Sequence, residues 1–148
     1  MLTKSERGFS LLELLIVVAI ILIIATIAIP SLLRSRQAAQ ESSAVAQVRT
    51  VNTAEVSYLS SNQGNYGSLP ELITAGLLDG RFSTSVSGYS FAVSASGSDY
   101  TVTATPTSTN AGRFGYFSTP DAVVRYQTAT SSTCNPCFPT GQSGAPVQ

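Results

Sequence analysis

The two cysteines of the chain stand close together, as Cys134-Asn-Pro-Cys137. Thiols at this spacing can form a disulfide, half of a zinc site or a redox-active pair. Zinc would need two further ligands, and the chain has no His and no other Cys, so we expect no metal site. A thioredoxin-type redox pair would stand at the start of a helix in a βαβ context, which the surrounding residues do not offer. A structural disulfide and a redox pair of another type remain. The redox state of the compartment in which the chain is located will favour one or the other.

A second candidate is a single carboxylate in the most apolar stretch of the chain. The stretch from Phe9 to Leu33 contains one ionisable side chain, Glu13, and a helix of about 20 apolar residues is long enough to cross a bilayer. An acidic side chain in a membrane helix costs about 2.5–3.5 kcal/mol at the centre and less near an end, so it usually has a partner. The simpler interpretation is that Glu13 only stabilises the positive amino end of a helix.

The composition excludes several classes of function. Eight basic and eight acidic side chains sum to zero over 148 residues and are spread singly, which argues against direct nucleic-acid binding. Without His, the most common general base and metal ligand is absent, so we expect no enzyme and no cofactor. The length leaves room for one modest globular domain behind the apolar stretch.

The charges before the apolar stretch predict its orientation. Lys4 and Arg7 precede it, and positive flanks stay cytoplasmic, so the remainder of the chain is predicted to be exported. The apolar run is longer than that of a secretory signal, and the small residue Gly8 precedes it rather than follows it. An exported chain favours oxidised thiols, which favours a structural disulfide between Cys134 and Cys137.

The residues around the predicted membrane boundary resemble a known leader. From Arg7 the sequence reads Arg-Gly-Phe-Ser-Leu-Leu-Glu-Leu-Leu, and Pro30 stands near the end of the apolar run. This combination resembles the class III leader and first helix of type IV pilins and pseudopilins. The resemblance implies that a prepilin peptidase cuts between Gly8 and Phe9, and that the new amino terminus of Phe9 is N-methylated. It also implies that Glu13 neutralises the amine of a neighbouring subunit and so sets the register of assembly.

The same resemblance implies partners and a location. The chain would be a structural subunit of a type IV pilus, serving motility, adhesion, DNA uptake or a related surface role. It would begin as a single-pass inner-membrane protein with its amino terminus in the cytoplasm. Assembly machinery would then move it into a homo-oligomeric helical filament at the cell surface. Residues 1–8 would be the leader, 9–33 the transmembrane and assembly half of a helix, and 34–148 the exported globular pilin domain.

The periodicity predicts an α+β fold that fits this picture. One long helix is expected from Phe9 to about Ser61, kinked at Pro30 because proline lacks an amide hydrogen. A capping-box pattern predicts a short helix from Ser68 to about Gly76. Period-two alternation predicts about four antiparallel strands on the carboxyl-terminal half of the long helix, at 89–94, 100–105, 113–117 and 122–126. The apolar stripe expected to face this sheet contains Ala38, Ala44, Val45, Val48, Val51, Val56 and Leu59.

The sheet and the tail carry two further expectations. The aromatic residues of the strands are expected to pack in the core rather than to bind a ligand. The tail from Phe138 to Gln148 is predicted to be mobile.

Three alternatives to a pilus subunit remain to be weighed. A pseudopilin of a type II secretion system, forming a short periplasmic filament, commonly has an acidic calcium site near its carboxyl end, whereas here only Asp121 follows Asp99. A monomeric membrane-anchored exported binding domain would share the hydropathy but would not need Gly8, Phe9 and Glu13 together. An exported redox enzyme would depend on the two cysteines. The pilus subunit is the interpretation that we prefer.

Overall fold

The computed structural model describes residues 9–128 and 144–147. The predicted leader 1–8, including Gly8, and the cysteine pair Cys134 and Cys137 lie outside the described residues. The chain divides into two compact units, Met1–Ser35 and Arg36–Gln148. Both units contain part of the long helix.

The long helix, α1, runs from Leu11 to Ser61 and confirms the predicted stem. Ser10 begins it, because the Ser10 carbonyl accepts the backbone N–H groups of Glu13 at 3.1 Å and Leu14 at 3.2 Å. The helix continues without a break through Pro30, so the predicted kink there stays a prediction. Beyond Ser61 the backbone turns into the left-handed region, which ends the helix in the usual way.

Two short helices connect α1 to the sheet. The first, α2 (Leu69–Thr74), confirms the helix predicted from the capping box. The Glu71 carboxylate accepts the Ser68 backbone N–H at 2.7 Å and the Ser68 hydroxyl at 2.6 Å. The second, the 3-10 helix η1 (Gly80–Ser83), begins where the Asp79 side chain accepts the Arg81 N–H at 2.8 Å.

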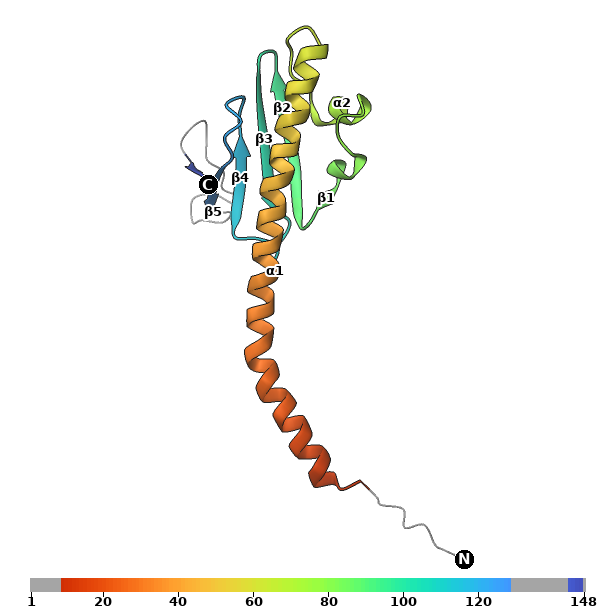
Figure 1. Ribbon diagram of the computed structural model, residues 1–148, viewed down its shortest axis with the longest axis vertical. Helices are drawn as coiled ribbons and strands as arrows, with labels where there is room; N and C mark the ends of the chain where they lie inside the picture. Colours follow the sequence, from red (N-terminus) through yellow and green to blue (C-terminus); the bar gives the residue numbers. More distant parts are fainter. Residues whose placement is uncertain (1–8, 129–143, 148) are drawn as a thin grey trace, which may run out of the picture. The chain divides into compact units, whose positions relative to one another are not determined.

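The described residues form one antiparallel sheet whose strand order follows the chain. The sheet has six strands rather than the predicted four. Figure 1 shows the second half of α1 lying across one face of this sheet. The strands are β1 (Ser85–Val86), β2 (Tyr89–Ser96), β3 (Asp99–Pro106), β4 (Phe114–Ser118), β5 (Arg125–Thr128) and β6 (Ala145–Pro146).

The predicted hairpin is confirmed as β2 and β3, which pair from Tyr89↔Pro106 to Ser96↔Asp99. Gly97 follows β2 with φ +59°, a conformation that glycine adopts without strain. A second two-residue turn joins β1 to β2, where Ser87 and Gly88 both have positive φ. The strand β1 was not predicted because two residues are too short for a period-two pattern.

The carboxyl-terminal strands differ from the prediction. β5 begins at Arg125 rather than at residue 122, because Ala122 has φ +57° and the Asp121 carboxylate accepts the Val123 N–H at 3.0 Å, which keeps this segment in a turn. The tail prediction is wrong for Ala145 and Pro146, which pair with Tyr126 and Arg125 as β6. Without β6, the edge strand β5 would have unpaired backbone N–H and C=O groups, and β6 pairs with them.

The core lies between the second half of α1 and the sheet. Ala44, Val48 and Val51 face it from the helix, as predicted. Two members of the predicted stripe do not: Ala38 is exposed, and Val56 is 56% exposed. The prediction that the strand aromatics pack in the core is confirmed, since each is buried or half-buried: Tyr89, Phe91, Tyr100, Phe114, Tyr116, Phe117 and Tyr126.

Candidate functional site: an exposed apolar half-helix

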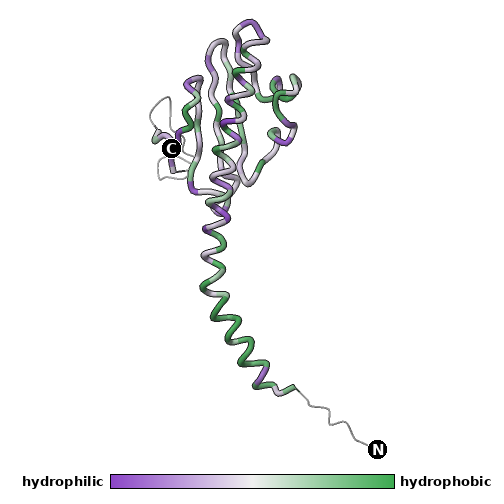
Figure 2. The backbone as a smooth tube through the Cα atoms, viewed as in Figure 1, coloured by the Kyte–Doolittle hydropathy of each residue, from purple (hydrophilic) through white to green (hydrophobic). Residues whose placement is uncertain are grey.

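The first half of α1 has an apolar surface that nothing in its own unit covers. An 18-residue window reaches a mean hydropathy of 3.1 with none of it buried, so the helix is long and apolar enough to cross a membrane. Figure 2 shows this half as an almost unbroken apolar stretch. The exposed fractions of its large apolar side chains range from 46% at Val18 to 79% at Leu11. Exposed apolar surface on this scale marks a membrane or protein contact.

The half-helix also has a shallow groove of about 400 Å³ along one side. The residues that line it follow helical spacing, with the small side chain of Ala19 set among larger ones. They are Leu11, Leu14, Leu15, Val18, Ala19 and Leu22. A small residue among leucines leaves a depression into which the ridge of another helix can fit.

Glu13 lies in the first turn of α1, two residues after the helix begins. Glu13 stands three residues after Ser10, as Glu71 stands three residues after Ser68. The two carboxylates nevertheless differ in their hydrogen bonds. Glu71 accepts two hydrogen bonds from Ser68, whereas no hydrogen bond or ion pair of the Glu13 carboxylate is found over residues 9–128 and 144–147. The Glu13 carboxylate is exposed and therefore open to a partner from another chain.

Phe9 is the first described residue and stands just before α1, with 74% of its surface exposed. Phe9 and Glu13 are four residues apart, about one helical turn. The predicted peptidase site spans Gly8 and Phe9, so its first half lies outside the described residues. The peptidase cut, the N-methylation of Phe9 and the register role of Glu13 therefore stay predictions.

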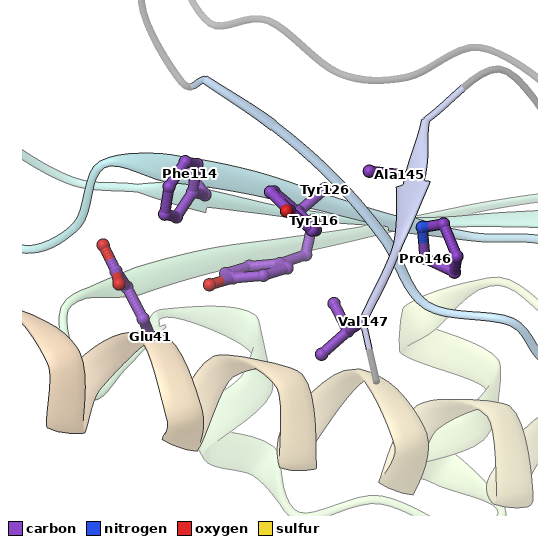
Figure 3. Close-up of a pocket in the computed structure, with 7 residues that line it drawn as sticks. All are labelled: Glu41, Phe114, Tyr116, Tyr126, Ala145, Pro146 and Val147. Carbon is purple, nitrogen blue, oxygen red and sulfur yellow. The ribbon is translucent and has the colours of Figure 1, made fainter.

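A different pocket, of about 530 Å³, opens in the second unit between α1 and the last three strands (Figure 3). The Glu41 carboxylate at its rim is already engaged by Arg113, which donates its backbone N–H at 2.8 Å, Nε at 3.2 Å and Nη2 at 3.1 Å. Burial raises the pKa of Tyr116, which lines the pocket, to about 12, so its phenol stays protonated at neutral pH. The lining residues are Glu41, Phe114, Tyr116, Tyr126, Ala145, Pro146 and Val147.

The described residues that line this pocket are one carboxylate, two phenols and apolar side chains. Its carboxylate is paired with the Arg113 guanidinium at 3.1 Å, and burial raises the pKa of Tyr116 further above neutral pH. In the part of the chain that the structure describes, no three His, Cys, Asp or Glu side chains gather as metal ligands would. The geometry thus directs attention to the apolar half-helix.

Sequence reasoning missed three polar residues on the inward face of α1: Glu41, which bonds Arg113 beside β4, Asn52, which bonds β3 and β4, and Glu55, which bonds Gly67 in the connection to α2. All three are buried. Asn52 donates to the Ser118 hydroxyl at 2.8 Å and accepts from the Tyr100 hydroxyl at 3.0 Å. Their burial could have been predicted from helical spacing. Each stands three, four or seven residues from Ala44, Val48 or Val51, so it lies on the same inward face of α1.

The fold and the half-helix together define a class. A long amino-terminal helix, apolar in its first half, with an antiparallel sheet packed on its second half, is the α+β architecture of pilins. Residues 3–29 match the family model described as the prokaryotic N-terminal methylation motif, so the chain carries the class III prepilin leader that type IV pilins and pseudopilins share. The resemblance predicted from the sequence is thereby confirmed. No curated protein matches the chain at a significant level.

Proposed function

We propose that this chain is a structural subunit of a type IV pilus filament, without catalytic activity of its own. The observation that carries the proposal is the exposed apolar surface of the first half of α1, most of which lies within the residues 3–29 that match the methylation motif. Peptidase cleavage after Gly8 removes Lys4 and Arg7, the charges that keep the amino end in the cytoplasm. The apolar half-helix can then exchange lipid for the helices of other copies. Residues 34–148 remain outside as the pilin domain.

Assembly in register is assigned to Glu13 and the amine of Phe9. An unpaired charge is costly in an apolar environment, and pairing removes much of that cost. The Glu13 carboxylate has no partner among the described residues, so the amine of an incoming copy is a suitable one. Because the pair forms at one axial offset only, it fixes the stagger between adjacent helices, as a buried polar residue fixes register in a coiled coil.

Two further assignments belong to this proposal. Pro30 loosens the helix locally, because its ring removes one backbone hydrogen bond, and this lets neighbouring helices approach. Cys134 and Cys137 form a structural disulfide in the oxidising compartment outside the inner membrane. Alkylation of the thiols before and after reduction, followed by mass spectrometry, tests the disulfide.

Two measurements test the proposed function. Mass spectrometry of the mature chain should find an amino terminus at Phe9 that carries one added methyl group. Electron microscopy of sheared surface material, labelled for this chain, should show long filaments. An intact Met1, or a cut elsewhere, would contradict the pilin interpretation, and short filaments confined to the periplasm would favour a pseudopilin of a secretion system instead.

The register mechanism has its own test in Glu13→Gln, which keeps the shape of the side chain and removes its charge. Loss of one partner of a buried ion pair costs about 3–5 kcal/mol, roughly 100-fold or more in each association step. We expect normal membrane insertion and a severe loss of filaments. Asp99→Asn is the matched control, because it removes one charge from the exposed first residue of β3 and should leave assembly unchanged. Filaments in normal number from Glu13→Gln would refute the register mechanism.

A further inference from the structure

Three large apolar side chains are exposed in the described part of the second unit, on α1, between α2 and η1, and in the turn before β5. Val56 and Val123 are 56% and 37% exposed and lie near the end of α1 and in the turn before β5. Leu77 is 37% exposed and lies between α2 and η1. A single exposed apolar side chain is common, but Val56 also lines a groove that contains a cation, and Leu77 stands two residues from the acidic Asp79.

The first surface is a groove of about 360 Å³ that we call the Arg49 groove. It is lined by Arg49, Asn52, Thr53, Val56, Ser57 and Ala122. Its walls are held in place before any partner arrives. Asn52 is bonded to β4 through Ser118 at 2.8 Å. The turn that carries Ala122 is held by the Arg125–Asp121 ion pair.

The polar groups of the Arg49 groove are mostly satisfied internally. The Thr53 hydroxyl donates to the Arg49 carbonyl at 3.0 Å, and the Ser57 hydroxyl donates to the Thr53 carbonyl at 2.9 Å. The guanidinium of Arg49 is exposed, and no ion pair is found for it within residues 9–128 and 144–147. The groove therefore presents apolar surface, with Val56 as its largest apolar side chain, and one cation.

The second surface, which we call the Leu77 turn, comprises residues 75–79. It follows α2, and Gly76 has φ +71°, which turns the chain, with Leu77 37% exposed after it. The turn itself contains one charged side chain, the exposed Asp79, with Glu71 before it on α2 and Arg81 after it on η1. An exposed apolar side chain near a carboxylate complements a groove with apolar surface and a cation.

The two surfaces belong to opposite edges of the sheet. η1 contacts β1 and β2, at the start of the strand order, while Ala122 precedes β5, near its end. Figure 1 accordingly shows α2 on one side of α1 and β4 with β5 on the other. A contact between two different surfaces of identical copies is heterologous, and repeated heterologous contacts build open helical assemblies.

We propose that the Leu77 turn of one copy docks into the Arg49 groove of the next copy, with Leu77 against Val56 and Asp79 facing Arg49. This interface rests on the proposed function, because it joins neighbouring subunits of the same filament. One pair of apolar side chains and one pair of charges are too little surface for a stable dimer alone. The contact therefore forms where the apolar halves of α1 already hold the copies together, and it orients the outer domains.

Cysteine cross-linking in filaments of the full chain tests this interface. The double variant Val56→Cys/Leu77→Cys, treated with a short bis-maleimide, should yield a ladder of covalent multimers. The matched control is Val56→Cys/Ser98→Cys, which moves the second thiol to the exposed tip between β2 and β3, and it should yield no ladder. The unsubstituted chain, treated alike, gives the background from Cys134 and Cys137.

The outcomes separate the interface from the proposed function. Filaments without a ladder from Val56→Cys/Leu77→Cys, or an equal ladder from the control, would overturn the interface and leave the pilus proposal standing. Absence of filaments from the unsubstituted chain would overturn both. If the double variant does not assemble, mixed filaments of the two single variants replace it, and covalent dimers in them support the interface while their absence overturns it.

Discussion

Asn52→Ala should be among the more destabilising changes in the second unit, because Asn52 links the helix to two strands. Its amide donates to Ser118 on β4 at 2.8 Å, and its carbonyl accepts from Tyr100 on β3 at 3.0 Å. Ser118 is fully buried and Tyr100 is 2% exposed, so water cannot readily replace either bond. Losing two such bonds and leaving both partners unsatisfied costs about 2–4 kcal/mol.

The partners of Asn52 allow a double-mutant cycle. Tyr100→Phe removes one of the two bonds and should cost roughly 1–2 kcal/mol. The costs of Asn52→Ala and Tyr100→Phe should not add, because the double variant loses their shared bond only once; a coupling energy of about 1 kcal/mol is expected. Thr53→Ala is the control, since Thr53 is exposed and bonded only to its own helix, and it should stay within about 0.5 kcal/mol.

Denaturant titration of the full chain in non-ionic detergent, followed by the near-ultraviolet circular dichroism of tyrosine, measures these free energies of unfolding. Tyrosine is a suitable probe because the chain has six tyrosines and no tryptophan. The far-ultraviolet signal is less suitable, because detergent preserves the apolar half-helix. A cost below about 1 kcal/mol for Asn52→Ala, or costs that add fully with Tyr100→Phe, would show that this network does not hold the helix to the sheet.

Two further changes test the packing and the pH dependence of the second unit. Gly112→Ala should lower the free energy of unfolding by about 1–3 kcal/mol, because a Cβ there would overlap the Tyr89 hydroxyl, which donates to the Phe114 carbonyl. A thermal melting temperature equal to that of the parent chain would contradict this prediction. Glu55 is fully buried, its Oε2 accepts the Gly67 N–H at 3.0 Å and its Oε1 has no hydrogen-bond partner among the described residues. Burial, and to a smaller degree the charge of Glu71, raise the pKa of Glu55 above its ordinary 4.5, so its contribution to stability is full below that value and declines as the pH rises through the folded-state pKa. Glu55→Gln should remove this decline, and parallel curves of unfolding free energy against pH for variant and parent would contradict the assignment.

The local elements were predictable from the sequence wherever the pattern was long. The apolar run after Ser10 is recognisable by its length and uniform hydropathy, and the continuation of the helix to Ser61 and the β2–β3 hairpin each repeat a period over many residues. The short helix α2 was predictable for a different reason, because the Ser68–Glu71 spacing has a specific hydrogen-bond geometry. β1 and β6 were not predictable, because a two-residue strand exists only where a neighbouring edge pairs with it.

Periodicity on the second half of α1 misjudged which polar residues matter. It placed Val56 toward the sheet, whereas the structure exposes Val56 and buries Asn52 and Glu55. Hydrophobic pattern ranks residues by side-chain type, but burial depends on the direction in which each side chain leaves the helix. A polar residue can lie inward when the opposite strand offers a partner, as Ser118 does for Asn52.

The sequence alone determined the leader, the apolar half-helix and the place of Glu13 in it, because cleavage motifs, hydropathy and helical spacing are local properties of the chain. Tertiary structure alone decided which surfaces the outer domain presents. The Arg49 groove needs Ala122 beside Val56, and residues so far apart in sequence are brought together only by packing between α1 and the β4–β5 turn. Long-range contacts of this kind leave no period in the sequence.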